Sequence, residues 1–190
     1  MDGELHRTAT PVAGEVSRPS AKQRFEALYR ANREPLLAYF LRRVENPHDA
    51  ADLLAQVFLI AWQRRDSLPP YEQQRLWLYG TARNLLLNHR RRRNRDQSLA
   101  VHLGNALVMR GGFVTGDVSG LAQDVRAVLG RLSDQDRELL MLSGWDGLSP
   151  AEIAAVLERP AATVRVALHR ARARLTALLN ETELSHSTGV

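Results

Sequence analysis

The sequence of 190 residues contains no cysteine, which excludes disulfide bonds, thiolate metal sites and cysteine nucleophiles. Long apolar segments are also missing. The longest runs, such as Val57–Trp62 and Leu85–Leu87, are much shorter than the roughly 18 residues that a membrane span needs. Residues 1–20 lack the basic start and apolar stretch of a secretory signal. We therefore expect a cytoplasmic protein that does not insert into a membrane.

Residues that typically carry catalysis are scattered. The six histidines show no paired ligand spacing, and the chain has neither a phosphate-cradling glycine motif nor a nucleophile elbow. Asp49 and Asp52 have a helical spacing that would suit a metal, but no third ligand is evident. Acidic residues are more common at the start of a helix, where they meet its positive end. We expect no enzymatic activity, no metal site and no cofactor.

Positive charge is concentrated in the first half of the chain. Residues 1–95 hold 17 basic and 10 acidic residues, whereas residues 96–190 hold 9 basic and 11 acidic residues. A positive field attracts phosphate backbones and releases their counterions, so the first half is a candidate nucleic-acid-binding region. The alternative is a basic surface that contacts only solvent.

The periodicity of apolar residues predicts an all-α fold, because helical spacing recurs and no useful strand-like alternation is present. Helix starts are marked by Asn46-Pro47, by Ser133 with Asp136 at the capping-box position, and by Ser149-Pro150-Ala151-Glu152. We predict two small helical domains joined by a flexible linker. The expected boundaries are a disordered tail at 1–20, a first domain at 21–95, a linker at 96–120 with one short helix around Val101–Met109, a second domain at 121–180, and a tail at 181–190.

A helix-turn-helix is the strongest local prediction, over Ser149–Leu175. A short capped helix is followed by a turn and by a longer basic helix ending near Leu179. One face of that helix is expected in the core, with Val164, Leu168, Ala171, Leu175 and Leu178. The outward face suits a DNA groove, with small apolar residues near the bases and arginines near phosphates. Its candidate residues are Ala162, Thr163, Arg165, Val166, His169, Arg170 and Arg172. An ordinary helical hairpin with a solvated basic face is the alternative.

A second candidate surface lies on the segment Asp49–Gln63. Its expected core residues are Leu53, Leu54, Val57, Phe58 and Ala61. Leu59 and Ile60 fall on the opposite face, among carboxylate and amide side chains, which favours a surface that binds a partner helix. The alternative is that another helix of the same bundle covers this pair.

The third candidate surface is the segment Leu76–Arg95, in which aromatic and amide side chains precede five arginines. Aromatics stack on bases, amides bind base edges and arginines follow the backbone, so this mixture suits melted or single-stranded DNA. The alternative places Trp77 and Tyr79 in the core and the arginines in solvent.

Together these segments resemble the extracytoplasmic-function group of bacterial RNA polymerase sigma factors. "NPHDAADLLAQVFLIAW" resembles the core-polymerase-binding helix of that group, and "LWLYGTARNLLLNHRRRR" is similar to the segment that melts and reads the minus-ten element. "LSPAEIAAVLERPAATVRVALHRARARL" resembles the helix-turn-helix for the minus-thirty-five element. The order of the three segments makes the resemblance specific.

The resemblance implies that the chain binds core RNA polymerase and promoter DNA, and that an anti-sigma factor regulates it. Polymerase binding would involve Asp49, Asp52, Leu53, Gln56, Leu59 and Ile60. The minus-ten element would be bound by Arg75, Trp77, Arg83, Asn84, Asn88, Arg91 and Arg92. The loop Ser67–Arg75 would help to hold an extruded base.

The chain departs from the usual pattern of the group at three places. Ala55-Gln56 replaces a Gln-Glu pair, Glu158 replaces the glycine of the turn, and Val166 and Ala167 occupy positions that are often polar or basic. Two other functions are open: a helix-turn-helix regulator that acts without polymerase, and an interaction protein that sequesters a polymerase subunit. Neither explains all three candidate surfaces.

Overall fold

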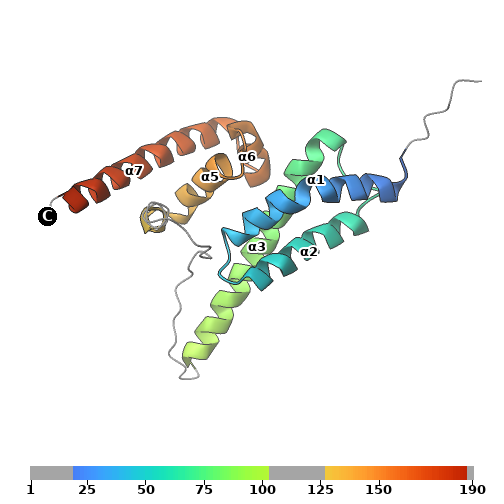
Figure 1. The fold of residues 1–190 in the computed structure, drawn as a ribbon, viewed down its shortest axis with the longest axis horizontal. Helices are drawn as coiled ribbons and strands as arrows, with labels where there is room; N and C mark the ends of the chain where they lie inside the picture. The colour runs from blue at the N-terminus through green and yellow to red at the C-terminus, as the bar shows by residue number, and fades with distance from the viewer. Residues whose placement is uncertain (1–18, 103–126, 188–190) are drawn as a thin grey trace, which may run out of the picture.

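The computed structural model describes residues 19–102 and 127–187, and every regular element in these ranges is a helix (Figure 1). The helices are α1 Ala21–Leu41, α2 Pro47–Gln63, α3 Tyr71–His102, α5 Asp134–Gly144, α6 Pro150–Leu157 and α7 Ala161–Ser187. Residues 127–131 are also helical. The predicted all-α fold is confirmed. We call α1–α3 the N-terminal domain and residues 127–187 the C-terminal domain.

Local sequence signals start the helices of the N-terminal domain. The Ser20 hydroxyl accepts a hydrogen bond from the Gln23 backbone N–H, and the Gln23 side chain accepts one from the Ser20 N–H. This capping box starts α1 at Ala21. Asn46 caps α2 and Pro47 occupies its first turn, as predicted. The three helices pack on one another around buried residues that include Leu36, Phe40, Val57 and Leu78.

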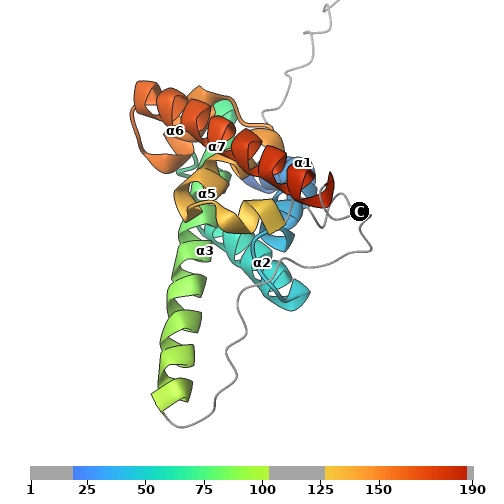
Figure 2. The same cartoon turned by 90° about the vertical axis from the view of Figure 1, so that its left-hand side faces the viewer.

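Two helices are longer than expected. Helix α3 continues past Arg95 to His102, and its C-terminal part extends beyond the other helices (Figure 2). Residues 96–102 are therefore helical, where a linker was expected. Helix α7 continues past Leu179 to Ser187. Its Glu181 carboxylate lies 2.8 Å from the guanidinium of Arg131, at the end of the helical residues 127–131. The remainder of the expected linker and most of its short helix lie outside the described residues.

Three helix starts or ends position the helix-turn-helix. Ser133 caps α5, but Asp136 does not complete the expected capping box because its carboxylate pairs with Arg174 on α7 instead. Ser149 and Glu152 form the predicted capping box of α6. Glu158 ends α6 in the left-handed conformation, with φ 53°. This turn directs the chain into α7, which packs against both α5 and α6.

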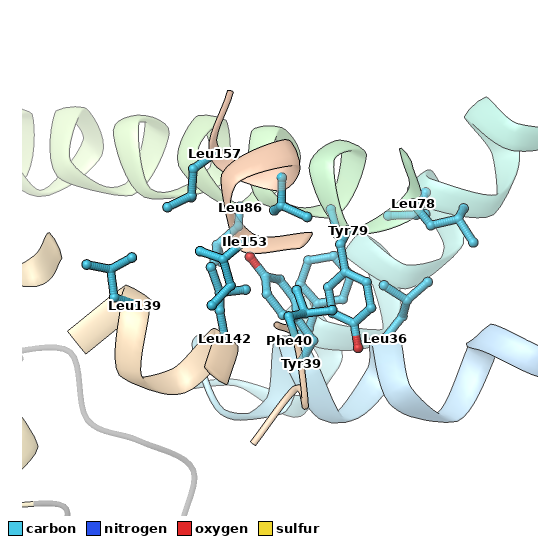
Figure 3. Close-up of a cluster of buried hydrophobic side chains, with 14 of the residues drawn as sticks. Leu36, Tyr39, Phe40, Leu78, Tyr79, Leu86, Leu139, Leu142, Ile153 and Leu157 are labelled. Atoms are coloured by element: carbon cyan, nitrogen blue, oxygen red, sulfur yellow. The ribbon is translucent and has the colours of Figure 1, made fainter. Parts of the chain in front are cut away.

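The two domains pack against each other through a continuous hydrophobic core. Tyr39 and Leu86 of the N-terminal domain and Leu142 and Ile153 of the C-terminal domain belong to one buried cluster (Figure 3). Helix α3 makes the main contact, against α6. Tyr39 is so deeply buried in this cluster that desolvation raises its pKa to about 12. The described residues therefore adopt a closed arrangement in which the C-terminal domain covers part of α3.

Candidate polymerase and DNA interfaces

The predicted partner surface on α2 is exposed. Leu59 is 55% exposed and Ile60 is partly exposed, so no other helix of the described structure covers this pair completely. Asp52 and Gln56 lie on the same exposed face. Leu53 differs, because it is only 3% exposed and packs in the core. The assignment of Leu53 to the polymerase-binding surface is therefore corrected: its side chain packs in the hydrophobic core beneath that surface.

Asp49 is the remaining polymerase-surface candidate on α2. Its carboxylate lies 3.5 Å from Nε2 of His89 on α3, and both side chains are about a quarter to a third exposed. This contact places the first turn of α2 beside α3. The acidic residues at the start of α2 therefore lie close to the helix that carries the predicted minus-ten residues.

The predicted minus-ten residues on α3 fall into two sets. Asn84, Asn88, Arg91 and Arg92 are exposed on the helix surface. Trp77 is partly buried against the core, and its neighbour Tyr79 is fully buried. The alternative that both aromatic residues belong to the core is therefore correct for Tyr79 and partly correct for Trp77.

The second set consists of Arg75 and Arg83, which pair with the C-terminal domain. Nε and Nη2 of Arg83 donate to the two carboxylate oxygens of Glu138, at 2.8 and 3.3 Å. The hydrogen-bonded Glu138 carboxylate raises the pKa of Arg83 above its usual value. Arg75 lies 3.5 Å from the Glu152 carboxylate and donates to the backbone carbonyl of Asp146 at 3.1 Å. Both arginines are therefore engaged within the protein.

A cleft of about 420 Å³ lies beside the contact between α3 and the helix-turn-helix. Both domains line it, with the indole of Trp77 and the amide of Asn84 on one side and Val156 and Glu158 on the other. The turn residue Glu158 therefore faces predicted minus-ten residues in the closed arrangement.

The outward face of α7 is as predicted. Val164, Leu168 and Ala171 are buried, and Leu175 and Leu178 are partly buried. Val166 is 50% exposed, which confirms the predicted rotation of the helix. The other residues of the predicted DNA face are also exposed, namely Ala162, Thr163, Arg165, His169, Arg170 and Arg172. Arg172 donates to the Ser143 hydroxyl at 3.0 Å.

The structure brings together one charged cluster that the sequence did not identify. The carboxylate of Asp146, in the loop between α5 and α6, accepts hydrogen bonds from Arg42 at 2.5 Å and Arg43 at 2.6 Å. These arginines directly follow α1, more than a hundred residues earlier in the chain. The opposite charges of the two halves were the only sequence signal that pointed to such a contact.

Within residues 19–102 and 127–187, no group of three or more histidine, aspartate or glutamate side chains is arranged to hold a metal ion. None of the described helices is both long and apolar enough to cross a membrane.

The fold and its exposed faces define a two-domain helical protein with a helix-turn-helix. Residues 28–96 match the family model for sigma-70 region 2, and residues 122–175 match that for sigma-70 region 4. The chain is 34% identical over 143 residues to the RNA polymerase sigma factor CnrH of Cupriavidus metallidurans, which covers 70% of this chain and 74% of that relative. It is 27% identical over 150 residues to the sigma factor SigW of Bacillus subtilis, covering 74% and 80%.

Two solved structures of sigma factors have folds similar to that of this chain. The sigma factor RpoE of Bartonella quintana, in complex with the anti-sigma factor NepR, matches with a TM-score of 0.67 and 25% identity over 83% of this chain and 97% of that one. CnrH in complex with the cytosolic domain of CnrY matches with a TM-score of 0.60 and 26% identity, over 84% and 90%. The chain therefore belongs to the extracytoplasmic-function group of the sigma-70 family. Sigma factors of this family direct RNA polymerase to initiate transcription at specific promoters.

Proposed function

We propose that this sigma factor uses three separate faces: α2 for core RNA polymerase, α3 for the minus-ten element and α7 for the minus-thirty-five element. The observation that supports this division is the exposure of Leu59, Asn84 and Val166, one on each face. Transcription with purified core polymerase on a library of genomic fragments tests the function. Transcripts with discrete 5′ ends that need this chain support it, and their absence contradicts it.

The face on α2 suits a protein partner. An apolar pair, Leu59 and Ile60, is bordered by Asp52 and Gln56, which gives a small hydrophobic centre with a polar rim. Such a centre excludes water when a partner helix covers it, while the rim sets the register. A charged or amide rim also favours a partner with basic and polar side chains.

The face on α3 suits DNA with unpaired bases. The amides of Asn84 and Asn88 can bind base edges, and the exposed Arg91 and Arg92 can follow the backbone. Trp77 is partly exposed on the same helix and lines the cleft, where its ring is a candidate for stacking.

The face on α7 suits the major groove of duplex DNA. Its centre is formed by small or apolar side chains, Ala162 and Val166, which can contact thymine methyl groups. Arg165, Arg170 and Arg172 surround this centre, where they can bind phosphates. We expect modest base discrimination and a large electrostatic contribution.

We also infer an anti-sigma partner, a cytoplasmic location and a purely regulatory role. The inference of a partner rests on the two similar structures, in which RpoE is bound to NepR and CnrH to CnrY. A protein that acts on RNA polymerase and chromosomal DNA works in the cytoplasm, and neither binding role needs catalysis. Isolation of a protein that binds this chain and competes with core polymerase for it would support the inferred anti-sigma partner. Co-purification with core polymerase distinguishes a sigma factor from a regulator that binds DNA alone.

A further inference from the structure

The contact between the two domains joins arginines of one to carboxylates of the other. Asp146 is the centre of the contact: its side chain has no exposed surface, and the Arg43 side chain that it binds is only 4% exposed. The Arg43 guanidinium also lies 3.8 Å from the centre of the Tyr39 ring. Because burial removes water from both charges, the Asp146 carboxylate is the anion that makes this position of Arg43 tolerable.

The same pattern continues along α3. Arg83 forms a forked contact with Glu138, and Arg75 lies near Glu152. Four arginines of the N-terminal domain are thus matched by three carboxylates of the C-terminal domain. The Arg75 pair is half exposed and screened by water, so the contacts of Asp146 and Glu138 dominate.

Guanidinium groups bind carboxylates and phosphates in the same forked geometry. Each carboxylate in this contact therefore occupies a position that suits a phosphate oxygen. Two of the four arginines, Arg75 and Arg83, already belong to the predicted minus-ten set. The other two, Arg42 and Arg43, directly follow α1 and lie in the half of the chain with the positive charge excess.

We propose that Arg42 and Arg43, with Arg75 and Arg83, form a binding surface for the DNA backbone, and that Asp146 and Glu138 occupy it in the closed chain. The proposal rests on the proposed function, because it takes promoter DNA as the competing polyanion. Closure and DNA binding by this surface are then mutually exclusive. When the C-terminal domain moves away, the buried Arg43 loses its anion, and a phosphate replaces the carboxylate.

DNA is the ligand that the surroundings of these arginines favour. The cleft is lined by chain neighbours of Arg75 and Arg83 on α3, among them Trp77 and Asn84, which suit bases. The exposed Arg91 and Arg92 continue the positive charge along α3. An acidic protein would use the arginines but not the aromatic and amide groups. We therefore choose an oligothymidine strand as the probe and a polyglutamate peptide as its comparison.

The test uses Asp146→Asn in the full chain. The substitution keeps the size of the side chain and removes the charge that holds Arg42 and Arg43. Small-angle X-ray scattering should show a larger radius of gyration than for the wild type. Fluorescence anisotropy should show oligothymidine affinity increased about fivefold or more, the scale of a typical coupling between sites. Adding Arg42→Ala and Arg43→Ala should cancel the gain and reduce the log–log salt slope by about 1.4.

Two further variants keep the outcome unambiguous. Asp134→Asn is the matched control, because it removes the same charge from a carboxylate that is 89% exposed and pairs only within its own domain. It should change neither the radius nor the affinity beyond the small effect of net charge. Glu138→Gln removes the other main contact at a partly exposed site, so it tests the surface if Asp146→Asn unfolds, as circular dichroism would show.

An unchanged radius and affinity in both interface variants would overturn the proposal. So would an opened chain that binds oligothymidine no better, or one that gains affinity only for polyglutamate. Promoter-specific transcription by the wild type is measured separately. A chain that fails to initiate transcription but shows the gain for oligothymidine would contradict the proposed function and leave the DNA-backbone surface standing.

Discussion

The carboxylate of Asp136 on α5 accepts two hydrogen bonds from Arg174 on α7, at 2.8 Å from Nε and 2.6 Å from Nη2. This pair connects α7, the second helix of the helix-turn-helix, to α5, which precedes the helix-turn-helix. Arg174 lies on α7, where arginines were expected near phosphates. Its guanidinium, however, donates to a carboxylate of the same domain, that of Asp136. We therefore assign Arg174 to the packing of α7 and leave the phosphate contacts to its neighbours.

The Asp136 pair predicts a dependence of stability on pH. Hydrogen bonds from Arg174, with one from Ser133, lower the pKa of Asp136 below its usual value. A carboxyl with a lowered folded-state pKa stabilises the fold above its unfolded pKa, about 4, and this contribution is lost as pH falls through the folded value. Between about pH 6 and pH 3 the wild type should lose more melting temperature than Asp136→Asn. Equal losses would contradict this, and Asp134→Asn serves as the exposed control.

The left-handed turn at Glu158 predicts a stabilising substitution. A residue with a Cβ atom costs about 1–2 kcal/mol in this conformation, whereas glycine adopts it without that penalty. Glycine also gives the unfolded chain more freedom, which offsets part of the gain. Glu158→Gly should therefore raise the free energy of unfolding by about 0.5–1 kcal/mol in urea denaturation.

The control for Glu158→Gly is Ala155→Gly, an exposed position inside α6. Glycine in a helix interior costs about 1 kcal/mol relative to alanine, so this variant should lose stability. If both variants lose stability, the backbone of Glu158 is not the source of strain, and its side chain contributes more to the fold than the turn geometry indicates.

The two sides of α2 should respond differently to mutation. Asp52→Arg combined with Gln56→Ala changes only exposed side chains, so it should weaken binding to core polymerase with little change in melting temperature. Leu53→Ala removes a buried side chain and should cost about 2–5 kcal/mol of stability. Affinity is measured by surface plasmon resonance and stability by thermal unfolding. A double variant that loses much of its stability while its affinity for core polymerase stays intact would contradict the assignment.

Helix starts and faces were predictable where their signals are local, whereas α3 and α7 continue beyond their predicted C-terminal ends. Asn46-Pro47 and the Ser149–Glu152 capping box each satisfy backbone groups within a few residues, and the apolar period of α7 fixes Val164 inside and Val166 outside. Signals that depend on distant residues were missed. Asp136 looked like a capping-box residue, but Arg174, 38 residues later, binds it instead.

The contact between the domains could not be predicted from the sequence, because it also depends on residues that are distant in the chain. Asp146 and the Arg42–Arg43 pair are separated by more than a hundred residues, and neither is part of a motif. The sequence indicated only that the two halves carry opposite charge excess. The partners of Arg75 and Arg83 lie on α5, on α6 and in the loop between these helices. Their position depends on how the C-terminal domain packs on α3, which no periodicity of a single helix predicts.

Asn84 should act in strand opening, since its amide is exposed on α3 beside the cleft. Asn84→Ala should lower the rate of open-complex formation on a duplex promoter. On a template already unpaired at the minus-ten element the defect should shrink, because melting is no longer needed. Permanganate footprinting measures opening of the duplex promoter, and transcript yield from both templates measures how far the defect shrinks. Equal defects would indicate a role in backbone binding or folding.

The recognition helix allows base contacts and phosphate contacts to be separated. Arg172 lies on the shoulder of α7, so Arg172→Ala should weaken binding to all duplex sequences alike. The slope of log affinity against log salt should fall by about 0.9, as for the loss of one phosphate contact. Titration of a selected site and of a scrambled duplex at several salt concentrations measures both. A loss confined to the selected site would show that Arg172 contacts a base instead.

Val166→Arg should instead change which sequence the chain prefers. Val166 is 50% exposed at the centre of the DNA face, so the long side chain extends into solvent and a new donor faces the bases. Arginine binds the O6 and N7 atoms of guanine in a forked geometry, and one such pair is worth about 1–3 kcal/mol of discrimination. The variant should keep its melting temperature and select sites with a new guanine. Val164→Arg is the matched control, because Val164 is only 1% exposed and the same substitution there should unfold the domain. A folded Val166→Arg protein with an unchanged site profile would show that this turn of α7 does not enter the groove.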